Sequence, residues 1–438
     1  MEKQKQLQDS VSSQLSMFTE KTDDGVYKVQ GAAVSIDNST GKVAAIVGGR
    51  EEDQEGYGLN RAYQSFRQPG SAIKPLLVYT PALEKGYTPN STLDDSRMTG
   101  NDAVSNAGYS YSGSISLRRA VEKSSNVATY RLYEELGTRT CMKYLEALNF
   151  KGLDKKDYKY NTTCLGGFTN GTTVVEMAAG YATIANDGEY RTPDCIIKIT
   201  DAKGNDIVPE DTSTKSVYSS SASRMMTSVL QSCVTEYEGT AHVCQLDVDM
   251  PAACKTGTTN NYVDGWLCGY TPYYTTAVWV GMDVYKSVDN LKGNTYPASI
   301  WTNYMNKIHQ GLPRKEFESY LGDTKAQQKR LRNLLKTTPK AQQKQLQKLS
   351  KMMIQHLTQQ KPMIPATTPT IIMIKTIIIT MIAIMIITII ITIIMEITIM
   401  ETTTAMITAI AETVVLIAET IAIVEKIAME KRANRQKI

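Results

Sequence analysis

Residues 251–283 read PAACKTGTTNNYVDGWLCGYTPYYTTAVWVGMD, and apolar, aromatic and β-branched residues fill most of these positions. Turn-forming residues divide the segment into three parts, at about 252–258, 262–270 and 274–283. Short runs of this composition between turns are typical of β-strands. The segment therefore predicts three consecutive strands joined by tight turns.

A second strand pair is predicted near the start of the globular sequence, where alternating apolar residues at 29–36 and 43–48 flank an Asn-Ser-Thr-Gly turn. Helical patterns lie between this hairpin and the three later strands, and one more follows them. They fall at about 72–85, 116–136, 173–186, 219–236 and 298–310. Strands at both ends with helices between them favour an α/β (α+β) domain, in which helices flank an antiparallel sheet.

Composition excludes several classes of protein. Hydrophobic residues make up 42% and charged residues 21% of the 438 positions, which is enough to form a core and excludes wholesale disorder. A net charge of +4 is too small to indicate nucleic-acid binding. Three histidines and seven cysteines without a C-x-x-C pair indicate neither a metal site nor a redox motif, so no metal or cofactor is predicted.

Composition also divides the chain. Residues 1–20 are polar and helix-like and lack the apolar stretch of a signal peptide, and the globular part runs over 28–320. A basic polar tail covers 321–370, and an Ile/Thr/Met-rich low-complexity tail covers 371–438. Within the last segment, 376–395 form an uncharged run of 20 residues, long enough to cross a bilayer. A membrane anchor and a slip of the reading frame both remain open there.

Ser71 and Lys74 form an S-x-x-K pair directly after a Pro-Gly turn at 69–70. The position predicts a helix start, where free backbone N–H groups favour negative charge on a hydroxyl oxygen. Lys74 lies three residues on, on the same helix face. A buried amine close to other cations can lose its proton and act as a base.

Two further patterns follow. Ser124 and Asn126 form S-x-N inside the helical pattern at 116–136, where a hydroxyl can relay a proton and an amide can bind a peptide group. Lys255, Thr256, Gly257 and Thr258 begin a predicted strand, and their ammonium and hydroxyl groups suit a carboxylate. Gly257 is expected to leave room for a substrate backbone to pair with the strand edge. The N–H groups of Ser71 and Thr258 are candidates for an oxyanion hole.

The ordered set S-x-x-K, S-x-N and K-T-G resembles the signature of penicillin-binding proteins and serine β-lactamases. Longer stretches are similar to the transpeptidase domain of class A (bifunctional) penicillin-binding proteins and cover about residues 28–312. They include VQGAAVSIDNSTGKVAAIVGG, NRAYQSFRQPGSAIKP, VEKSSNVATYRL, LGGFTNGTTVVEMAAGYATIANDGEYRTP and KTGTTNNYVDGWLCGYTP. The resemblance implies a penicillin-binding protein/serine β-lactamase-like fold over 28–320, with 1–27 as the remnant of a linker helix. It gives no sign of that family's glycosyltransferase domain in this chain.

The resemblance also implies a role for each matching residue. Ser71 would be the acyl-forming nucleophile and Lys74 its base, while Ser124 would pass the proton to the leaving D-alanine. Asn126 would hold the donor peptide, and Lys255, Thr256 and Thr258, spaced by Gly257, would bind the terminal carboxylate of D-Ala-D-Ala. These roles require the Ser71 hydroxyl to lie within hydrogen-bonding reach of Lys74 or Ser124.

The implied activity is D,D-transpeptidation of peptidoglycan stem peptides, with β-lactams acylating Ser71. Implied partners are the cell-wall synthesis machinery and not nucleic acid, and the implied location is the extracytoplasmic face of the bacterial cell membrane, with membrane association of the full-length protein. A D,D-carboxypeptidase, a serine β-lactamase and a non-catalytic penicillin sensor remain alternatives. A β-lactamase would need a glutamate that activates water, and Glu176 is the candidate.

Overall fold

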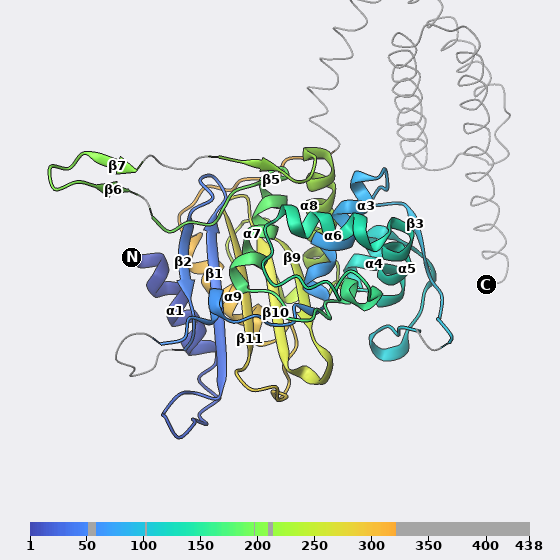
Figure 1. Cartoon of the computed structure of the whole chain (residues 1–438), viewed down its shortest axis with the longest axis horizontal. Coiled ribbons are helices and arrows are strands. Elements are labelled where there is room, and N and C mark those ends of the chain that lie inside the picture. Colours follow the sequence, from blue (N-terminus) through green and yellow to red (C-terminus); the bar gives the residue numbers. More distant parts are fainter. Residues whose placement is uncertain (51–57, 101–102, 197, 209–212, 321–438) are drawn as a thin grey trace, which may run out of the picture. The chain divides into compact units, whose positions relative to one another are not determined.

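The computed structural model describes residues 1–50, 58–100, 103–196, 198–208 and 213–320 (Figure 1). The chain divides into two units, Met1–Arg332 and Asn333–Ile438, and all described residues belong to the first. The predicted basic tail at 321–370 and the Ile/Thr/Met-rich tail at 371–438, with its candidate anchor, lie outside the described residues. Within the described part, every helix is too short or too polar to cross a membrane.

A five-stranded antiparallel sheet with the strand order β2-β1-β11-β10-β9 forms the centre of the first unit (Figure 1). The predicted hairpin is present and pairs with the last of the three later strands, so the two ends of the globular sequence meet in one sheet. The strands are β1 (Val29–Asp37), β2 (Val43–Val47), β9 (Ala253–Thr258), β10 (Asp264–Tyr270) and β11 (Tyr274–Met282).

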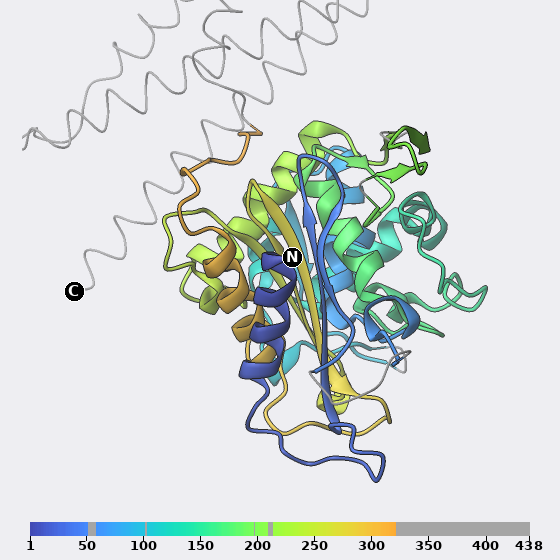
Figure 2. The ribbon, with the colours of Figure 1, turned by 90° about the vertical axis from the view of Figure 1, so that its left-hand side faces the viewer.

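Helices cover both faces of this sheet, as predicted. The first and last helices pack side by side on one face, and the other face carries α7 and α8 (Figure 2). The α-helices are α1 (Glu2–Gln14), α2 (Arg61–Gln64), α3 (Thr80–Glu84), α4 (Leu117–Glu122), α5 (Asn126–Leu136), α6 (Thr138–Ala147), α7 (Val174–Ala185), α8 (Ser220–Thr235) and α9 (Tyr296–Ile308).

Shorter elements connect these layers. Six single helical turns are present among the described residues: η1 (Gly70–Ile73), η2 (Pro75–Tyr79), η3 (Ala107–Tyr109), η4 (Asn161–Leu165), η5 (His242–Cys244) and η6 (Asn260–Tyr262). Three small two-stranded sheets pair β3 (Thr92–Asp95) with β4 (Gly113–Ser116), β5 (Glu189–Tyr190) with β8 (Lys215–Ser216), and β6 (Ile199–Thr200) with β7 (Asp206–Val208).

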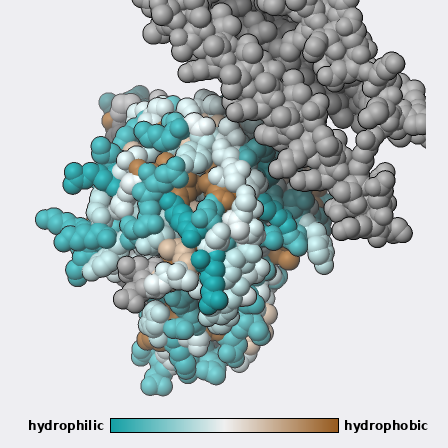
Figure 3. All heavy atoms as spheres, turned by 90° about the vertical axis from the view of Figure 1, so that its right-hand side faces the viewer, coloured by the Kyte–Doolittle hydropathy of each residue, from teal (hydrophilic) through white to brown (hydrophobic). Residues whose placement is uncertain are grey.

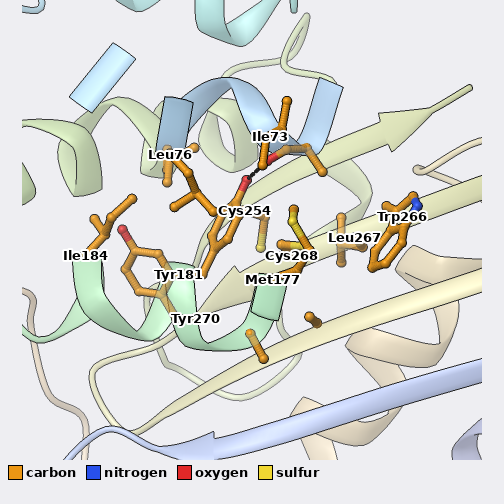
Figure 4. Close-up of a cluster of buried hydrophobic side chains, with 14 of the residues drawn as sticks. Ile73, Leu76, Met177, Tyr181, Ile184, Cys254, Trp266, Leu267, Cys268 and Tyr270 are labelled. Carbon is orange, nitrogen blue, oxygen red and sulfur yellow. Dashed lines mark hydrogen bonds between the residues drawn. The ribbon is translucent and has the colours of Figure 1, made fainter. Parts of the chain in front are cut away.

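The core beneath the predicted S-x-x-K pair joins the sheet, α7 and the segment after Ser71. Tyr181 of α7 is fully buried, and its hydroxyl donates to the Ala72 carbonyl at 2.7 Å. Figure 4 shows side chains of α7, β10 and the segment with Ile73 and Leu76 in one buried cluster. This hydrogen bond links α7 to the residue that follows Ser71.

The predicted helix at 116–136 is two helices. The chain breaks between α4 and α5 at Ser124, whose φ is +54°. A left-handed backbone costs a non-glycine residue roughly 1–2 kcal/mol, so other contacts must hold it. The helical pattern predicted the elements on both sides of the break but not the break itself, which lies at the predicted S-x-N residues.

Candidate active site

The turn that carries Ser71 is held against the end of β9. Gly70 has a φ of +51°, and a Cβ there would lie 2.9 Å from the Thr258 carbonyl oxygen. Glycine is therefore required by both the backbone conformation and the space. Ser71 follows as the second residue of η1 and is half-buried.

Long-range hydrogen bonds fix the approach to this turn. The Gln68 side chain accepts from the Phe168 N–H and donates to the Phe168 carbonyl, each at 2.6 Å. The Trp266 indole N–H donates to the Gln68 carbonyl at 2.8 Å. The Arg67 guanidinium forms an ion pair with the buried Asp264 carboxylate at 2.7 Å. The residues before Ser71 are thus tied to β10 and to the loop at 166–172.

Lys74 is fully buried, and its ammonium points to the break between α4 and α5. Its Nζ donates to three acceptors: the Ser124 carbonyl at 2.9 Å, the Ser125 carbonyl at 3.1 Å and the Asn126 side-chain oxygen at 2.7 Å. An ammonium has three N–H donors, whereas a neutral amine has two and a lone pair. This geometry therefore fits the protonated form.

Two opposing effects act on the proton of Lys74. Burial, followed by the positive charge of Lys255, lowers the pKa of Lys74 well below its ordinary value, while Cys164 and Asp95 act the other way. The three acceptors stabilise the ammonium. Lys74 can therefore become a base once it gives up one of these hydrogen bonds.

The expected contact of Ser71 is not formed. Within the described residues, the Ser71 hydroxyl makes no hydrogen bond to Lys74 or to Ser124, because the Lys74 donors are directed to the three acceptors at 124–126. Catalytic hydrogen bonds are commonly long before substrate binds and shorten in the complex.

Lys255 approaches the same break from the sheet. It is fully buried on β9 and donates to the Ser124 hydroxyl at 2.9 Å and to the Thr256 carbonyl at 3.1 Å. Burial lowers the pKa of Lys255 to about 8, and Cys233 and Cys268 oppose this shift. Ser124 therefore lies between two lysines: Lys74 binds its backbone, and Lys255 binds its side chain.

β9 is the edge strand of the sheet, so its outer side has no strand partner among the described residues. A Cβ at Gly257 would lie 2.4 Å from the Pro69 carbonyl oxygen and 2.9 Å from the Ala72 Cβ. The missing side chain therefore makes room for the turn that carries Ser71, and the expected pairing of a substrate backbone with this strand edge stays a prediction. Thr256 is buried, and the Thr258 hydroxyl accepts from the Gly293 N–H at 2.9 Å.

These three segments, brought together from 67–74, 124–126 and 255–258, place a hydroxyl, two buried amines and a second hydroxyl at one site. A profile described as the penicillin binding protein transpeptidase domain matches residues 31–329. The chain belongs to this family.

The comparisons extend this assignment. Penicillin-binding protein 4 of Bacillus subtilis (strain 168) is 36% identical over 275 residues, which are 62% of this chain and 43% of that protein. Penicillin-binding protein 1A of Clostridium perfringens (strain ATCC 13124) is 34% identical over 326 residues, which are 70% of this chain and 38% of that protein. The chain thus spans about two fifths of the length of these relatives.

Solved structures agree. The penicillin-binding protein PonA1 from Mycobacterium tuberculosis matches with a TM-score of 0.62 and 25% identity, over 72% of this chain and 85% of that one. PonA1 in complex with penicillin V matches with a TM-score of 0.60 and 25% identity, over 72% and 86% of the two chains. The predicted fold and the predicted family are therefore confirmed.

In this member of the penicillin-binding transpeptidase family, both polar atoms of the half-buried Asn126 side chain bind other groups of the protein. Its side-chain oxygen accepts from Lys74, and its amide nitrogen donates to the Ser105 carbonyl at 2.8 Å. The second N–H of the amide and one lone pair of its oxygen remain available for the predicted donor-peptide contact.

Glu176, the candidate water-activating base, is a structural residue. It forms a capping box with Thr173 at the start of α7, and its other oxygen accepts from the Lys151 N–H at 2.5 Å. A carboxylate held in this way is committed to the backbone. The β-lactamase alternative therefore loses its only glutamate candidate.

Sequence reasoning missed the residues that support the site. Arg67 and Asp264 were not singled out, nor were Asp95 and Asn106, which lie beside the break at Ser124. Among the described residues, no group of three or more His, Cys, Asp and Glu side chains is arranged to bind a metal. For the break itself, Ser125 was an available signal, because serine is a common N-cap residue and can mark a second helix start inside a helical pattern.

Proposed function

We propose that this domain is a serine-type D,D-transpeptidase that crosslinks peptidoglycan stem peptides through an acyl-enzyme at Ser71. The proposal rests on two hydrogen bonds to Ser124. Lys74, three residues after the proposed nucleophile, donates to the Ser124 carbonyl, and Lys255 on the edge strand donates to the Ser124 hydroxyl. No motif alone would indicate the activity, whereas the three together supply a nucleophile, a base, a relay and a carboxylate-binding cation.

The first half of the reaction forms an ester. Lys74, as a neutral amine, takes the Ser71 proton while Ser71 Oγ attacks the carbonyl carbon of the penultimate D-alanine. The C–N bond of the terminal peptide link breaks, and the proton passes through the Ser124 hydroxyl to the departing amine of D-alanine. The N–H groups of Ser71 and Thr258 stabilise the oxyanion, and Lys255 with Thr256 and Thr258 binds the terminal carboxylate.

The second half transfers the acyl group. An acceptor amine attacks the ester carbonyl, the ester C–O bond breaks, and Ser71 regains its proton as a new peptide bond forms. A β-lactam follows only the first half, because its ring amide opens and the amine stays attached to the acyl group. With Glu176 committed to its capping box, we expect no glutamate to activate water, so the acyl-enzyme persists.

The family also suggests the setting of this reaction. Peptidoglycan, the proposed substrate, lies outside the cytoplasm. We therefore place the domain at the extracytoplasmic face of the bacterial cell membrane, associated with the membrane in the full-length protein. Partners from the cell-wall synthesis machinery and β-lactam antibiotics follow from the same assignment.

The test is covalent labelling of the full chain with a fluorescent penicillin, followed by peptide mass mapping. We expect a stable adduct on the peptide that contains Ser71, no adduct in Ser71→Ala, and an unchanged adduct in Ser114→Ala, which alters an exposed serine. Absence of label from the folded wild-type chain would overturn the proposal, and rapid release of the label would indicate a β-lactamase.

Products then separate the remaining alternatives. Incubation with stem peptides that carry an acceptor amine should give crosslinked dimers. Trimmed peptides without dimers would indicate a D,D-carboxypeptidase, and an adduct with neither product would indicate a penicillin sensor.

A further inference from the structure

A buried carboxylate that the proposed reaction does not use lies next to the break at Ser124. Asp95, the last residue of β3, is 2% exposed, and no cationic side chain pairs with it in the described part of the chain. It accepts three hydrogen bonds: from the Ser125 hydroxyl at 2.6 Å, the Asn106 side-chain nitrogen at 2.7 Å and the Ser112 N–H at 2.8 Å. Burying a carboxylate that receives hydrogen bonds only from neutral donors costs free energy. This cost points to a role for the residues that Asp95 holds in place.

Asn106 extends this contact to the helix that begins at Asn126. Its side-chain oxygen accepts from the backbone N–H groups of Asn126 at 2.8 Å and Val127 at 3.0 Å, the first two of α5. Free N–H groups at a helix start are usually satisfied by a neighbouring residue, but here the acceptor is twenty positions earlier in the chain. The carboxylate of Asp95 fixes the orientation of the amide, because only its nitrogen can donate to Asp95.

The segment held in this way is the one that binds Lys74. The three acceptors of the Lys74 ammonium are two backbone carbonyls and one side-chain oxygen, all from residues 124–126. Ser125 is bound to Asp95, and Asn126 is bound to Asn106. The position of these acceptors, and of Ser124 with its left-handed backbone, therefore depends on the Asp95–Asn106 pair.

We infer that Asp95 and Asn106 are positioning residues of the acylation step, which set the place of Ser124 and Asn126 relative to Lys74. This inference rests on the proposed transpeptidase function. The two residues differ in one respect: Asn106 acts through geometry alone, whereas Asp95 also brings a negative charge toward Lys74.

That charge makes a positioning role distinguishable from a purely structural one. The groups that act on the Lys74 ammonium are Lys255, which lowers the pKa of Lys74, and Cys164 and Asp95, which raise it. If Lys74 must be neutral to act as the base, acylation rises as the pH passes the pKa of Lys74. Removing the charge of Asp95 lowers that pKa, so the acid limb of the acylation rate must move to lower pH.

The first experiment measures the rate of penicillin acylation against pH for the full-length wild type and Asp95→Asn. We expect a decrease of about 10- to 100-fold on the plateau, the effect of a small misplacement of reacting groups, and an acid limb displaced to lower pH. An unchanged plateau, or a lower plateau with an unmoved limb, would overturn the inference.

The second experiment exchanges the two groups. Asn106→Asp places two carboxylates against each other and should slow acylation, whereas Asp95→Asn combined with Asn106→Asp restores one charge and one amide and should recover most of the wild-type rate. A double variant that is slower than both single variants would show that the pair has no positioning role. This comparison remains decisive if Asp95→Asn alone fails to fold.

The matched control is Glu176→Gln, which also neutralises a buried carboxylate that accepts backbone N–H groups, but on α7. We expect it to lower thermal stability without changing the acylation rate or its pH profile. An equal loss of rate in this control would reduce the Asp95 effect to general destabilisation. If wild type labels at Ser71 and Asp95→Asn labels identically, only this inference fails; if wild type does not label, the proposed function fails first.

Discussion

The two sides of the site are built in different ways. On the sheet side, Lys255 and Thr256 stand on β9, and each residue is placed by the register with β10, such as Cys268 opposite Lys255 and Leu267 opposite Thr256. On the helical side, residues 124–126 form a break whose backbone is held by side chains from distant segments. A ladder of backbone hydrogen bonds tolerates side-chain changes, whereas a break held by side chains does not.

Figure 3 shows the hydropathy of one face of the domain. Hydrophilic residues dominate this view, and hydrophobic residues form small, separate patches. Scattered patches of this kind need no binding partner. The buried hydrophobic residues of the described domain form one core, part of which Figure 4 shows.

The largest effect should follow from removing the buried amine that binds the helical side. Lys74→Ala deletes the proposed base and leaves the acceptors at 124–126 without their donor. Loss of a general base typically slows a reaction by about 10²- to 10⁴-fold, and we expect this decrease in the rate of penicillin acylation, measured by gel fluorescence over time. Lys85→Ala, which alters an exposed lysine, is the control. Acylation of Lys74→Ala at the wild-type rate would contradict the assigned role.

The contact between the Ser71 turn and the sheet can be tested next. Gly257→Ala places a methyl group 2.4 Å from the Pro69 carbonyl oxygen, so the turn must move away from β9. We expect acylation to slow by roughly 10- to 100-fold, with reduced thermal stability. Gly167→Ala is the matched change, because its new methyl group meets only the Thr162 carbonyl oxygen at 3.7 Å. Equal rates in the two variants would show that the turn and strand are not coupled.

The sheet side should also have a pH signature. Because the pKa of Lys255 is about 8, its ammonium is lost above that pH, and recognition of a carboxylate should weaken about tenfold for each further pH unit. Acylation by an ordinary penicillin should show this alkaline limb. A substrate with a capped carboxylate should not show it, and Lys255→Arg should move it to higher pH. The same limb with a capped substrate would assign the titration to another group.

The lowered pKa of Lys255 also makes the stability of the fold depend on pH. The pKa of Lys255 is lower in the folded state than the 10.5 expected for an unfolded chain, so the unfolded state binds more protons between these values. The contribution of Lys255 to stability is therefore unfavourable below about pH 8 and is relieved as the pH rises toward 10.5. In denaturant titrations of the wild type, this effect should raise the free energy of unfolding between about pH 8 and 10.5. The same rise should be absent from Lys255→Met.

The smallest expected effect concerns one of several supports of the helical side. Ser125→Ala removes the N-cap of α5, whose hydroxyl accepts from the Ala128 N–H, and should lower stability by about 1 kcal/mol. Acylation should fall only a few-fold, because Asn106 still holds the helix start. Ser219→Ala removes the equivalent cap of α8 and should match the stability loss with no change in rate. Identical rates in both variants would show that the Ser125 hydroxyl has no part in placing Ser124.

Several elements could be predicted because their signals are local. The hairpin at β1 and β2, the three strands after residue 250 and helix α7 follow from alternation, turn residues and a helical pattern, all read within a few positions. The reactive residue types at Ser71, Lys74, Ser124 and Lys255 were likewise recognisable from short motifs. The break at Ser124 was missed because a helical pattern continues through it, and its left-handed backbone is stabilised by residues far away in the chain.

The sequence by itself determined which strands and helices follow one another along the chain, the family, and the chemical groups available for acyl transfer. Each of these depends on neighbouring residues. Only the tertiary structure decided which acceptors bind the Lys74 ammonium, why Gly257 must lack a side chain, and that Asp95 and Asn106 support the segment opposite Ser71. Such contacts join residues separated by eleven to almost two hundred positions. Burial and hydrogen-bond geometry select them after the chain has folded, so no local pattern encodes them.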